Sequence, residues 1–181
     1  MQRLFPLLLA VSIAAACGCT RSLGSQPGTA SAAPLPAATG ADANALLARG
    51  EYLVRIAGCN DCHTPGYAEQ QGNVDKALWL TGSPLGFRGP WGTTYPTNLR
   101  LLVAGMDEAS WMDYSASLRT RPLMPDFAVR DMVEDDRRAL YRFMRSLGPA
   151  GVPAPAFLPP GEVPATPHLD MVVPPPTPKA G

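Results

Sequence analysis

The sequence lacks an excess of charge of one sign. Among its 181 residues, 15 Lys and Arg side chains balance 15 Asp and Glu side chains, and neither half of the chain has a run of like charges. A surface that binds nucleic acid requires clustered basic side chains, so no nucleic acid is expected as a partner. A long hydrophobic run is also lacking, because the mostly apolar stretch from Leu4 to Ala16 is too short to span a bilayer.

Sustained alternation of apolar and polar residues is absent too, so the sequence predicts no β-strand. The 35 residues from Gly66 to Arg100 are instead rich in Gly, Pro, Thr and Asn, which favour turns. Such a long irregular region is unusual in a compact domain unless something else organises it, and a large buried cofactor would do so. The chain is therefore predicted to be all-α, with long loops between its helices.

Capping residues and helical spacing predict three main helices. The first, within 42–58, starts at an aspartate cap, ends at a glycine and leads into Cys59. The second, within 107–122, also starts at an aspartate and stops before a proline. The third, from about 134 to 148, has acidic residues first, basic residues later and a Gly-Pro terminator.

Composition divides the chain into four segments. Residues 1–16 are predicted to be an export signal, because they have a positive start and a mostly apolar stretch that ends in small residues. Residues 17–41 are rich in Ser, Ala, Gly, Pro and Thr and are predicted to be a flexible linker. Residues 42–148 contain all Trp and Tyr side chains and form the predicted domain. Residues 149–181 form a proline-rich tail that is expected to wrap the domain or stay extended.

The end of the signal resembles the lipobox of bacterial lipoproteins, because Ala14-Ala15-Ala16 immediately precedes Cys17. The resemblance implies lipidation of Cys17, a lipid anchor on a membrane and a periplasmic location. Ala14 stands where lipoboxes usually have a large aliphatic residue, so ordinary cleavage after Ala16 stays open. In that case Cys17 and Cys19 could pair.

Cys59-Asn60-Asp61-Cys62-His63 is the C-x-x-C-H pattern of covalent c-type haem attachment. Two thiols one helical turn apart can reach the two vinyl groups of one porphyrin, and the imidazole of the next residue then lies beneath the iron. Cys59 and Cys62 are therefore predicted to form the thioethers of one haem c, and His63 is predicted to be an axial ligand of the iron.

The cysteine pair also allows three other interpretations: a disulfide, a redox dithiol and half of a zinc site. A thioredoxin-like dithiol lies in a βαβ unit, which the sequence lacks. Tetrahedral zinc needs two further ligands, and His168 in the proline-rich tail is a poor candidate. A disulfide would leave His63 without a role.

The second axial ligand in electron-transfer cytochromes c is usually methionine. Met124 is favoured because Pro122 and Pro125 restrict its loop and fix the direction of the side chain. Met106, in a turn before the second helix, is not excluded by position. The remaining methionines lie in the signal, in or beside predicted helices, where core packing is the expected role, or in the tail: Met1, Met112, Met132, Met144 and Met171.

From Leu47 to Gly148 the chain resembles class I cytochromes c, especially the single-haem domains in cytochrome subunits of bacterial membrane-bound dehydrogenases. The resemblance rests on elements in a fixed order: the helix that ends at the C-x-x-C-H motif, Gly89-Pro90-Trp91-Gly92-Thr93, Pro96-Thr97-Asn98-Leu99, Leu123-Met124-Pro125 and the terminal helix 140–147. It implies the class I cytochrome c fold, with about three main helices and long loops around one covalent haem, followed by an extended tail.

The resemblance also implies roles for individual residues. Met124 would be the distal iron ligand, and Trp91, Thr97 and Asn98 would lie near the haem edge or propionates. The first and last helices would cross closely, with the glycine at 50 against the aromatic at 143. The sequence departs from the dehydrogenase subunits in two ways. It has a single attachment motif where they have several, and its stretch between Asn98 and Met124 is shorter.

The expected function is that of a periplasmic electron carrier, which transfers single electrons between redox protein partners and is not an enzyme. A membrane-bound dehydrogenase or a terminal oxidase is a candidate partner. One alternative is a haem subunit of a larger dehydrogenase or oxidase complex. Another is a haem peroxidase or gas-binding protein, should Met124 leave the iron open, but the predicted domain has no second histidine beside His63 to serve as a distal acid or base.

Overall fold

The computed structural model describes residues 40–172. The predicted signal peptide, Cys17 and the predicted linker up to residue 39 lie outside the described residues. The described elements are α1 (Gly40–Ile56), α2 (Cys59–His63), the 3-10 helix η1 (Lys76–Leu78), β1 (Gly86–Gly89), β2 (Gly92–Thr94), α3 (Leu99–Ala104), α4 (Glu108–Ala116), α5 (Asp126–Arg130), α6 (Glu134–Ser146) and β3 (His168–Asp170).

The three predicted main helices are present as α1, α4 and α6. The cap predicted for α4 is confirmed, since the Asp107 carboxylate accepts a hydrogen bond from the Ser110 N–H at 2.8 Å. This helix ends at Ala116, well before Pro122. At its end the Ser117 hydroxyl donates a hydrogen bond to the Asp113 carbonyl at 2.8 Å. Three shorter helices, α2, α3 and α5, add to the helix-rich fold.

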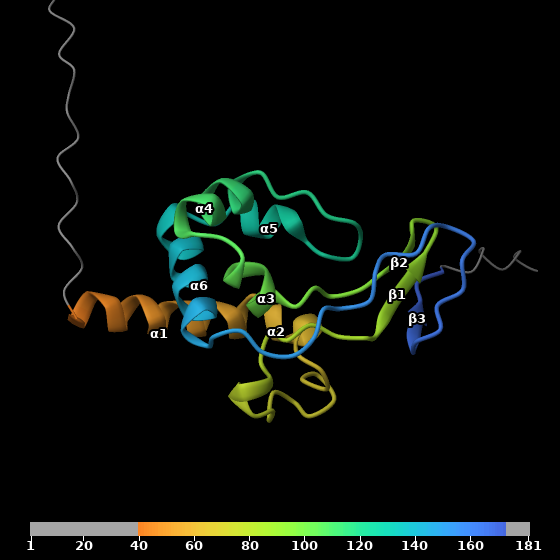
Figure 1. The fold of residues 1–181 in the computed structure, drawn as a ribbon, viewed down its shortest axis with the longest axis horizontal. Helices are drawn as coiled ribbons and strands as arrows, with labels where there is room; N and C mark the ends of the chain where they lie inside the picture. The colour runs from red at the N-terminus through yellow and green to blue at the C-terminus, as the bar shows by residue number, and fades with distance from the viewer. Residues whose placement is uncertain (1–39, 173–181) are drawn as a thin grey trace, which may run out of the picture. The chain divides into compact units, whose positions relative to one another are not determined.

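The prediction of an all-α chain is confirmed only in part: the described residues are rich in helix, but they also include a three-stranded sheet with the order β2-β1-β3. β1 pairs antiparallel with β2 and parallel with β3, which lies in the proline-rich tail. Strands of three or four residues are too short to show alternation in the sequence. In Figure 1 this sheet lies away from the crossing of α1 and α6.

The packing of α1 against α6 organises the helices (Figure 1). Gly50 of α1 lies so close to α6 that an added Cβ would be 2.1 Å from the carbonyl oxygen of Ala139 and 2.6 Å from the Cβ of Phe143. The close crossing expected at these residues is therefore present. Leu53 and Val54 of α1 and Phe143 of α6 are buried there.

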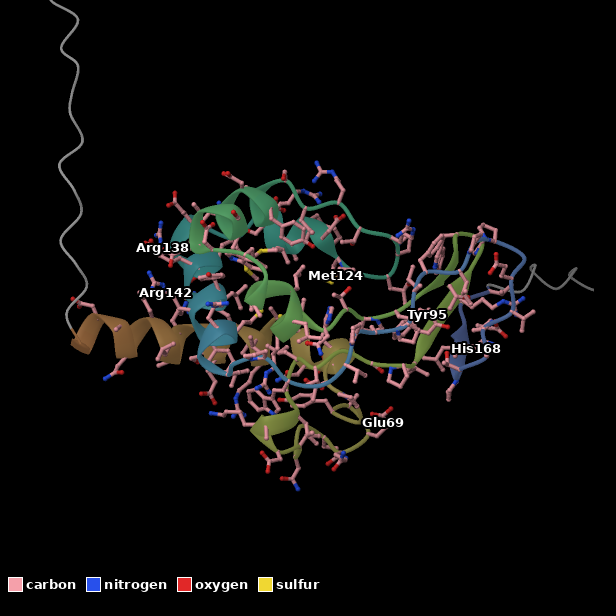
Figure 2. The ribbon with its side chains drawn as sticks, in the orientation of Figure 1. Glu69, Tyr95, Met124, Arg138, Arg142 and His168 are labelled. Carbon is pink, nitrogen blue, oxygen red and sulfur yellow. The ribbon has the colours of Figure 1, made fainter. Side chains whose placement is uncertain are left out.

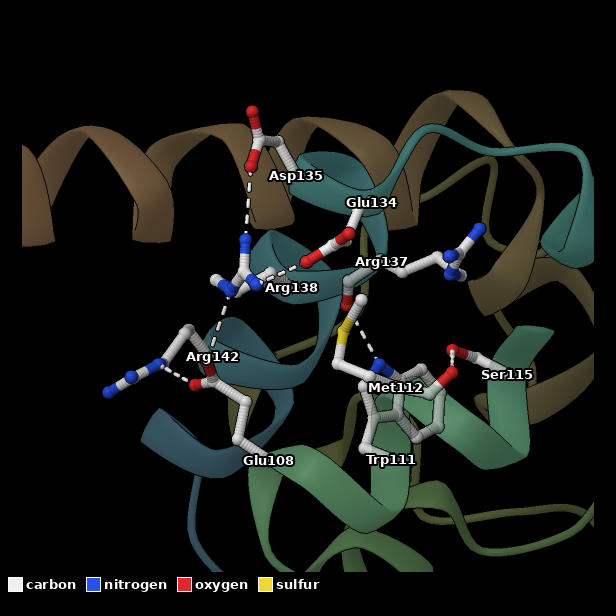
Figure 3. A network of polar contacts seen from close by, with 9 residues as sticks. All are labelled: Glu108, Trp111, Met112, Ser115, Glu134, Asp135, Arg137, Arg138 and Arg142. Carbon is white, nitrogen blue, oxygen red and sulfur yellow. Dashed lines mark hydrogen bonds and ion pairs between the residues drawn. The ribbon is translucent and has the colours of Figure 1, made fainter. Parts of the chain in front are cut away.

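α4 packs against α6 through a polar network on the surface and an apolar contact beneath it (Figure 3). Arg138 forms ion pairs with Glu108, Glu134 and Asp135, and Glu108 also pairs with Arg142. Below them Trp111 is 5% exposed, and its indole N–H donates to the Arg137 carbonyl at 2.8 Å. These contacts fix α4 beside α6.

No helix in the described part of the chain is long and apolar enough to cross a membrane.

We expect Gly50→Ala to destabilise the protein. The added methyl would force α1 away from the Ala139 backbone, which cannot yield as a flexible side chain could. Overpacking costs about 1–3 kcal/mol, and the higher helix propensity of alanine returns at most about 1 kcal/mol. Urea denaturation measures the difference. Gly105→Ala is the matched control, because the nearest atom to its Cβ would be 3.6 Å away; equal stability of the two variants would contradict the close crossing.

A second prediction concerns the ion pair between α1 and α6, in which Arg49 contacts both carboxylate oxygens of Asp136 at 2.8 and 2.9 Å. The hydrogen bond from Arg49 holds the pKa of Asp136 below its usual value. A carboxyl with a lowered pKa stabilises the fold above its unfolded pKa, and this contribution is lost as the pH falls through the folded pKa.

Asp136→Asn should therefore be less stable than the wild type at neutral pH, with a difference that disappears in acid. The difference will be small, because the Arg49 side chain is 49% exposed. Urea denaturation at the two pH values measures it. Asp113→Asn serves as the control, since Asp113 forms no ion pair within residues 40–172. A pH-independent effect of Asp136→Asn would exclude this role of the ion pair.

Candidate functional site

A cavity of about 450 Å³ lies between the helices and the sheet-side loops, and it brings together the residues that the sequence predicts as ligands. Cys59, Cys62 and His63 line it from α2, and Met124 lines it from the loop before α5. Most of the remaining lining is apolar, with contributions from α1, α3, α4 and α6. Its volume lies in the range of small-molecule and cofactor sites, about 300–1,000 Å³.

α2 is positioned by the glycine that separates it from α1. Gly58 has φ +69°, a left-handed conformation that favours glycine, and it ends one helix and precedes the next. The short helix then places Cys59 and Cys62 one turn apart, with His63 directly after them. The spacing inferred from the motif is thus the spacing of a real helical turn.

His63 is buried and held by one hydrogen bond. Its Nδ1 lies 2.7 Å from the carbonyl oxygen of Thr97, and the ring is 8% exposed. A carbonyl only accepts, so Nδ1 must carry the proton and Nε2 keeps a free lone pair. Burial lowers the pKa of His63, against the opposing effect of the Thr97 carbonyl. The ring is therefore neutral at pH 7, in the tautomer that can bind a metal through Nε2.

The two cysteines are free in the structure and are not joined as a disulfide. Burial raises the pKa of Cys59 to about 11, and partial burial raises the pKa of Cys62 in the same direction. Both thiols are therefore protonated near pH 7. Reactive redox dithiols have the opposite property, a lowered thiol pKa, so this geometry does not favour the redox-dithiol interpretation.

The zinc interpretation also finds no further ligands. Within residues 40–172 no group of three or more His, Cys, Asp or Glu side chains is placed to hold a metal ion. His168, the other histidine, lies on β3 and bonds the Thr166 carbonyl at 3.1 Å.

Three methionines line the cavity: Met124, Met132 and Met144. Met124 is partly buried and stands on the inner side of the loop that precedes α5 (Figure 2). Met144 is 3% exposed in the core. Met106, which the sequence left open, packs against the core cluster and is not among the residues that line the cavity.

The loop that carries Met124 is held at both ends. Before it, the Thr94 hydroxyl of β2 donates to the Pro122 carbonyl at 2.7 Å. After it, the Asp126 carboxylate accepts from the Thr120 N–H at 2.7 Å and from Arg130 at 2.6 Å. The Thr120 N–H and Arg130 hold the pKa of Asp126 below its usual value, so this carboxylate is ionised at pH 7.

The structure separates the three residues that were expected near the haem edge or propionates. Thr97 lines the cavity and positions His63, whereas Trp91 and Asn98 are not among the lining residues. The Asn98 side chain caps α3, accepting from the Leu101 N–H at 3.0 Å, and donates to the Ala150 carbonyl at 2.8 Å. The indole N–H of Trp91 is buried and has no hydrogen-bond partner within the described residues.

Sequence reasoning missed several residues at the cavity. Tyr95, Arg119 and Arg121 line it, and so do Phe87 and Phe157 (Tyr95 is labelled in Figure 2). The lining residues that the structure describes include both arginines but no carboxylate. No spacing pattern links these residues, because they come from four separate segments.

The cavity therefore offers two thiols, a neutral imidazole and the thioethers of three methionines within a largely apolar wall, with arginines as its only charged groups among the described residues. Such a set suits a large, mostly apolar group that carries an iron ion and negative charge. No family model, curated protein or solved structure matches the chain, so the resemblance to class I cytochromes c stays a prediction.

Proposed function

We propose that the chain is a c-type cytochrome that carries single electrons on one covalent haem. The observation that carries the proposal is the convergence of Cys59, Cys62, His63 and Met124 on one apolar cavity. The motif and Met124 are far apart in the sequence, and the motif alone does not require Met124 to lie at the same cavity. The cavity thus links the attachment motif to a methionine of the type expected as the second iron ligand.

Each of these residues has a defined role in the proposal. Cys59 and Cys62 hold the porphyrin through thioether bonds, and His63 and Met124 bind the iron. The Thr97 carbonyl keeps His63 in the tautomer whose Nε2 can bind iron. The haem supplies an iron that alternates between two oxidation states, and the protein supplies its ligands and surroundings.

The surroundings support a carrier in two ways. An apolar wall disfavours the more charged ferric centre and so raises the reduction potential. Arg119 and Arg121 are the charged lining residues within the described part of the chain, and they fit the carboxylate groups of a haem. Cys62 is exposed while His63 is buried, so a redox partner would approach the bound haem from the Cys62 side.

The proposed setting is the periplasm, with a lipid anchor at Cys17 and redox proteins as partners. A membrane-bound dehydrogenase or a terminal oxidase fits as a transient partner, because electron-transfer encounters are small and weak. The alternative is a haem subunit that a larger dehydrogenase or oxidase complex retains during purification. Copurification with such a complex from detergent-solubilised membranes distinguishes a stable subunit from a transient carrier, because the lipid anchor would place both on the membrane.

We expect Met124→Ala to change the iron spectrum while leaving the haem attached. The oxidised wild type should show the weak far-red band of iron–sulfur ligation, and the variant should lose it because its iron has no thioether. Visible spectra of the oxidised and reduced proteins test this. Met132→Ala removes a different methionine of the cavity and should keep the band. Loss of the band in Met132→Ala alone would assign the ligand to Met132.

A further prediction concerns attachment. The double variant Cys59→Ser/Cys62→Ser should carry no haem on a denaturing gel stained for haem, because serine forms no thioether. The wild type should keep its haem under the same conditions. Cys19→Ser is the matched control and should stain like the wild type. A wild-type protein without stain, after expression with the haem-attachment machinery, would contradict the proposed function.

A further inference from the structure

The proline-rich tail supplies part of the cavity wall. After α6 the chain runs back along the domain to the sheet (Figure 1), and we call residues 149–158 the return segment. Pro155 and Phe157 of this segment line the cavity. The sequence predicted only that the tail would wrap the domain or stay extended, and it gave no sign that the tail would reach the site.

Hydrogen bonds hold the return segment at both ends. Near its start, the Asn98 amide donates to the carbonyls of Ala150 and Val152 at 2.8 and 3.1 Å. At its end, Leu158 forms an antiparallel bridge with Thr93 of β2, with bonds of 2.8 and 3.0 Å. The segment is therefore tied to the domain on each side of Phe157.

Gly92, which directly precedes the bridge residue Thr93, allows the return segment to approach β2 closely. Gly92 has φ +100°, and a Cβ on it would lie 2.2 Å from the Leu158 carbonyl oxygen and 3.0 Å from the Phe157 ring. Only glycine meets both demands, since other residues rarely adopt this φ and their Cβ would collide with the segment. β2 is thus shaped to receive the return segment.

Phe157 in turn contacts the loop that carries Met124. The guanidinium of Arg121 lies 3.8 Å from the centre of the Phe157 ring, a cation–π contact. Arg121 forms no ion pair within residues 40–172, so the guanidinium interacts with the Phe157 ring and not with a carboxylate. The carbonyl of the next residue, Pro122, accepts a hydrogen bond from the Thr94 hydroxyl of β2. β2 and the return segment therefore hold the same loop at adjacent residues.

From these contacts we propose that Phe157 is a positioning residue for Met124: it holds the 118–125 loop through Arg121 and so keeps Met124 at the cavity. The role of Met124 as an iron ligand rests on the proposed function. The hold on the loop does not, because it is a property of the protein chain alone. The two can therefore be tested separately in the full-length protein.

The first measurement is amide hydrogen exchange in three variants. Phe157→Leu keeps a large apolar side chain but removes the ring, Phe157→Tyr keeps the ring, and Val163→Ala alters a tail residue that is 72% exposed. A cation–π contact at an exposed site corresponds to about a two- to fivefold change in an equilibrium, so loop amides should exchange about two- to fivefold faster in Phe157→Leu. Phe157→Tyr and Val163→Ala should match the wild type.

The second measurement is the binding of imidazole to the oxidised haem protein, which must displace Met124. A looser loop should let imidazole bind about two- to fivefold more tightly in Phe157→Leu than in the wild type, by the same cation–π contribution. In the hydrogen-exchange measurement, the loop amides of the Arg121→Gln/Phe157→Leu double variant should exchange no faster than those of either single variant, because both changes remove the same contact.

Three outcomes would overturn the inference. The first is wild-type loop exchange in Phe157→Leu. The second is an increase that extends equally to α1 and α6, since this indicates general destabilisation. The third is additivity in the double variant. A purified protein without haem would overturn the proposed function and the ligand role of Met124, yet the exchange experiment would still decide whether Phe157 holds the loop.

Discussion

The rest of the structure depends on the contact of α1 with α6 at Gly50, where the two helices meet almost backbone to backbone. α1 ends at Ile56, and the motif begins at Cys59, so the position of α1 determines where the two thiols and His63 lie. α6 contributes Leu140 and Met144 to the cavity lining. A side chain at residue 50 would therefore alter the cavity as well as the helix pair.

A second constraint is the apolar surrounding of the motif. The same burial that raises the pKa of Cys59 lowers the pKa of His63, because an apolar environment disfavours a thiolate and an imidazolium alike. The thiol of Cys59 and the imidazole of His63 are thus neutral where they face the cavity. The Thr97 carbonyl adds direction to the imidazole without adding net charge. The raised thiol pKa distinguishes Cys59 and Cys62 from reactive cysteines, whose surroundings stabilise the thiolate.

The sequence predicted the parts of the fold that depend on local chemistry. Asp107 caps α4 as expected, and the C-x-x-C-H spacing falls within one helical turn. The sheet was missed because β1 pairs with β3 about 80 residues later, and such a non-local contact leaves no local pattern. Asn98 was assigned to the haem surroundings, although an asparagine directly before a helix is also a good cap, and the structure uses it as one.

The residues of the cavity that the sequence did not reveal share one property. Arg121 and Phe157 reach the site because of tertiary packing, and neither stands at a spacing that marks a ligand. Met124 could be favoured in advance because its flanking prolines restrict the local backbone. Sequence reasoning therefore pointed to cavity residues whose position is set by their neighbours in the chain, and it missed residues whose position is set by contacts across the fold.

The order of the chain gives the return segment a consequence for biogenesis. The C-x-x-C-H motif precedes this segment by almost 90 residues, so the segment is synthesised well after the motif. Until then the chain lacks Pro155 and Phe157, two of the residues that line the cavity. Under the proposed function, this order of synthesis would leave an interval in which haem could attach to the cysteines before these two lining residues are added.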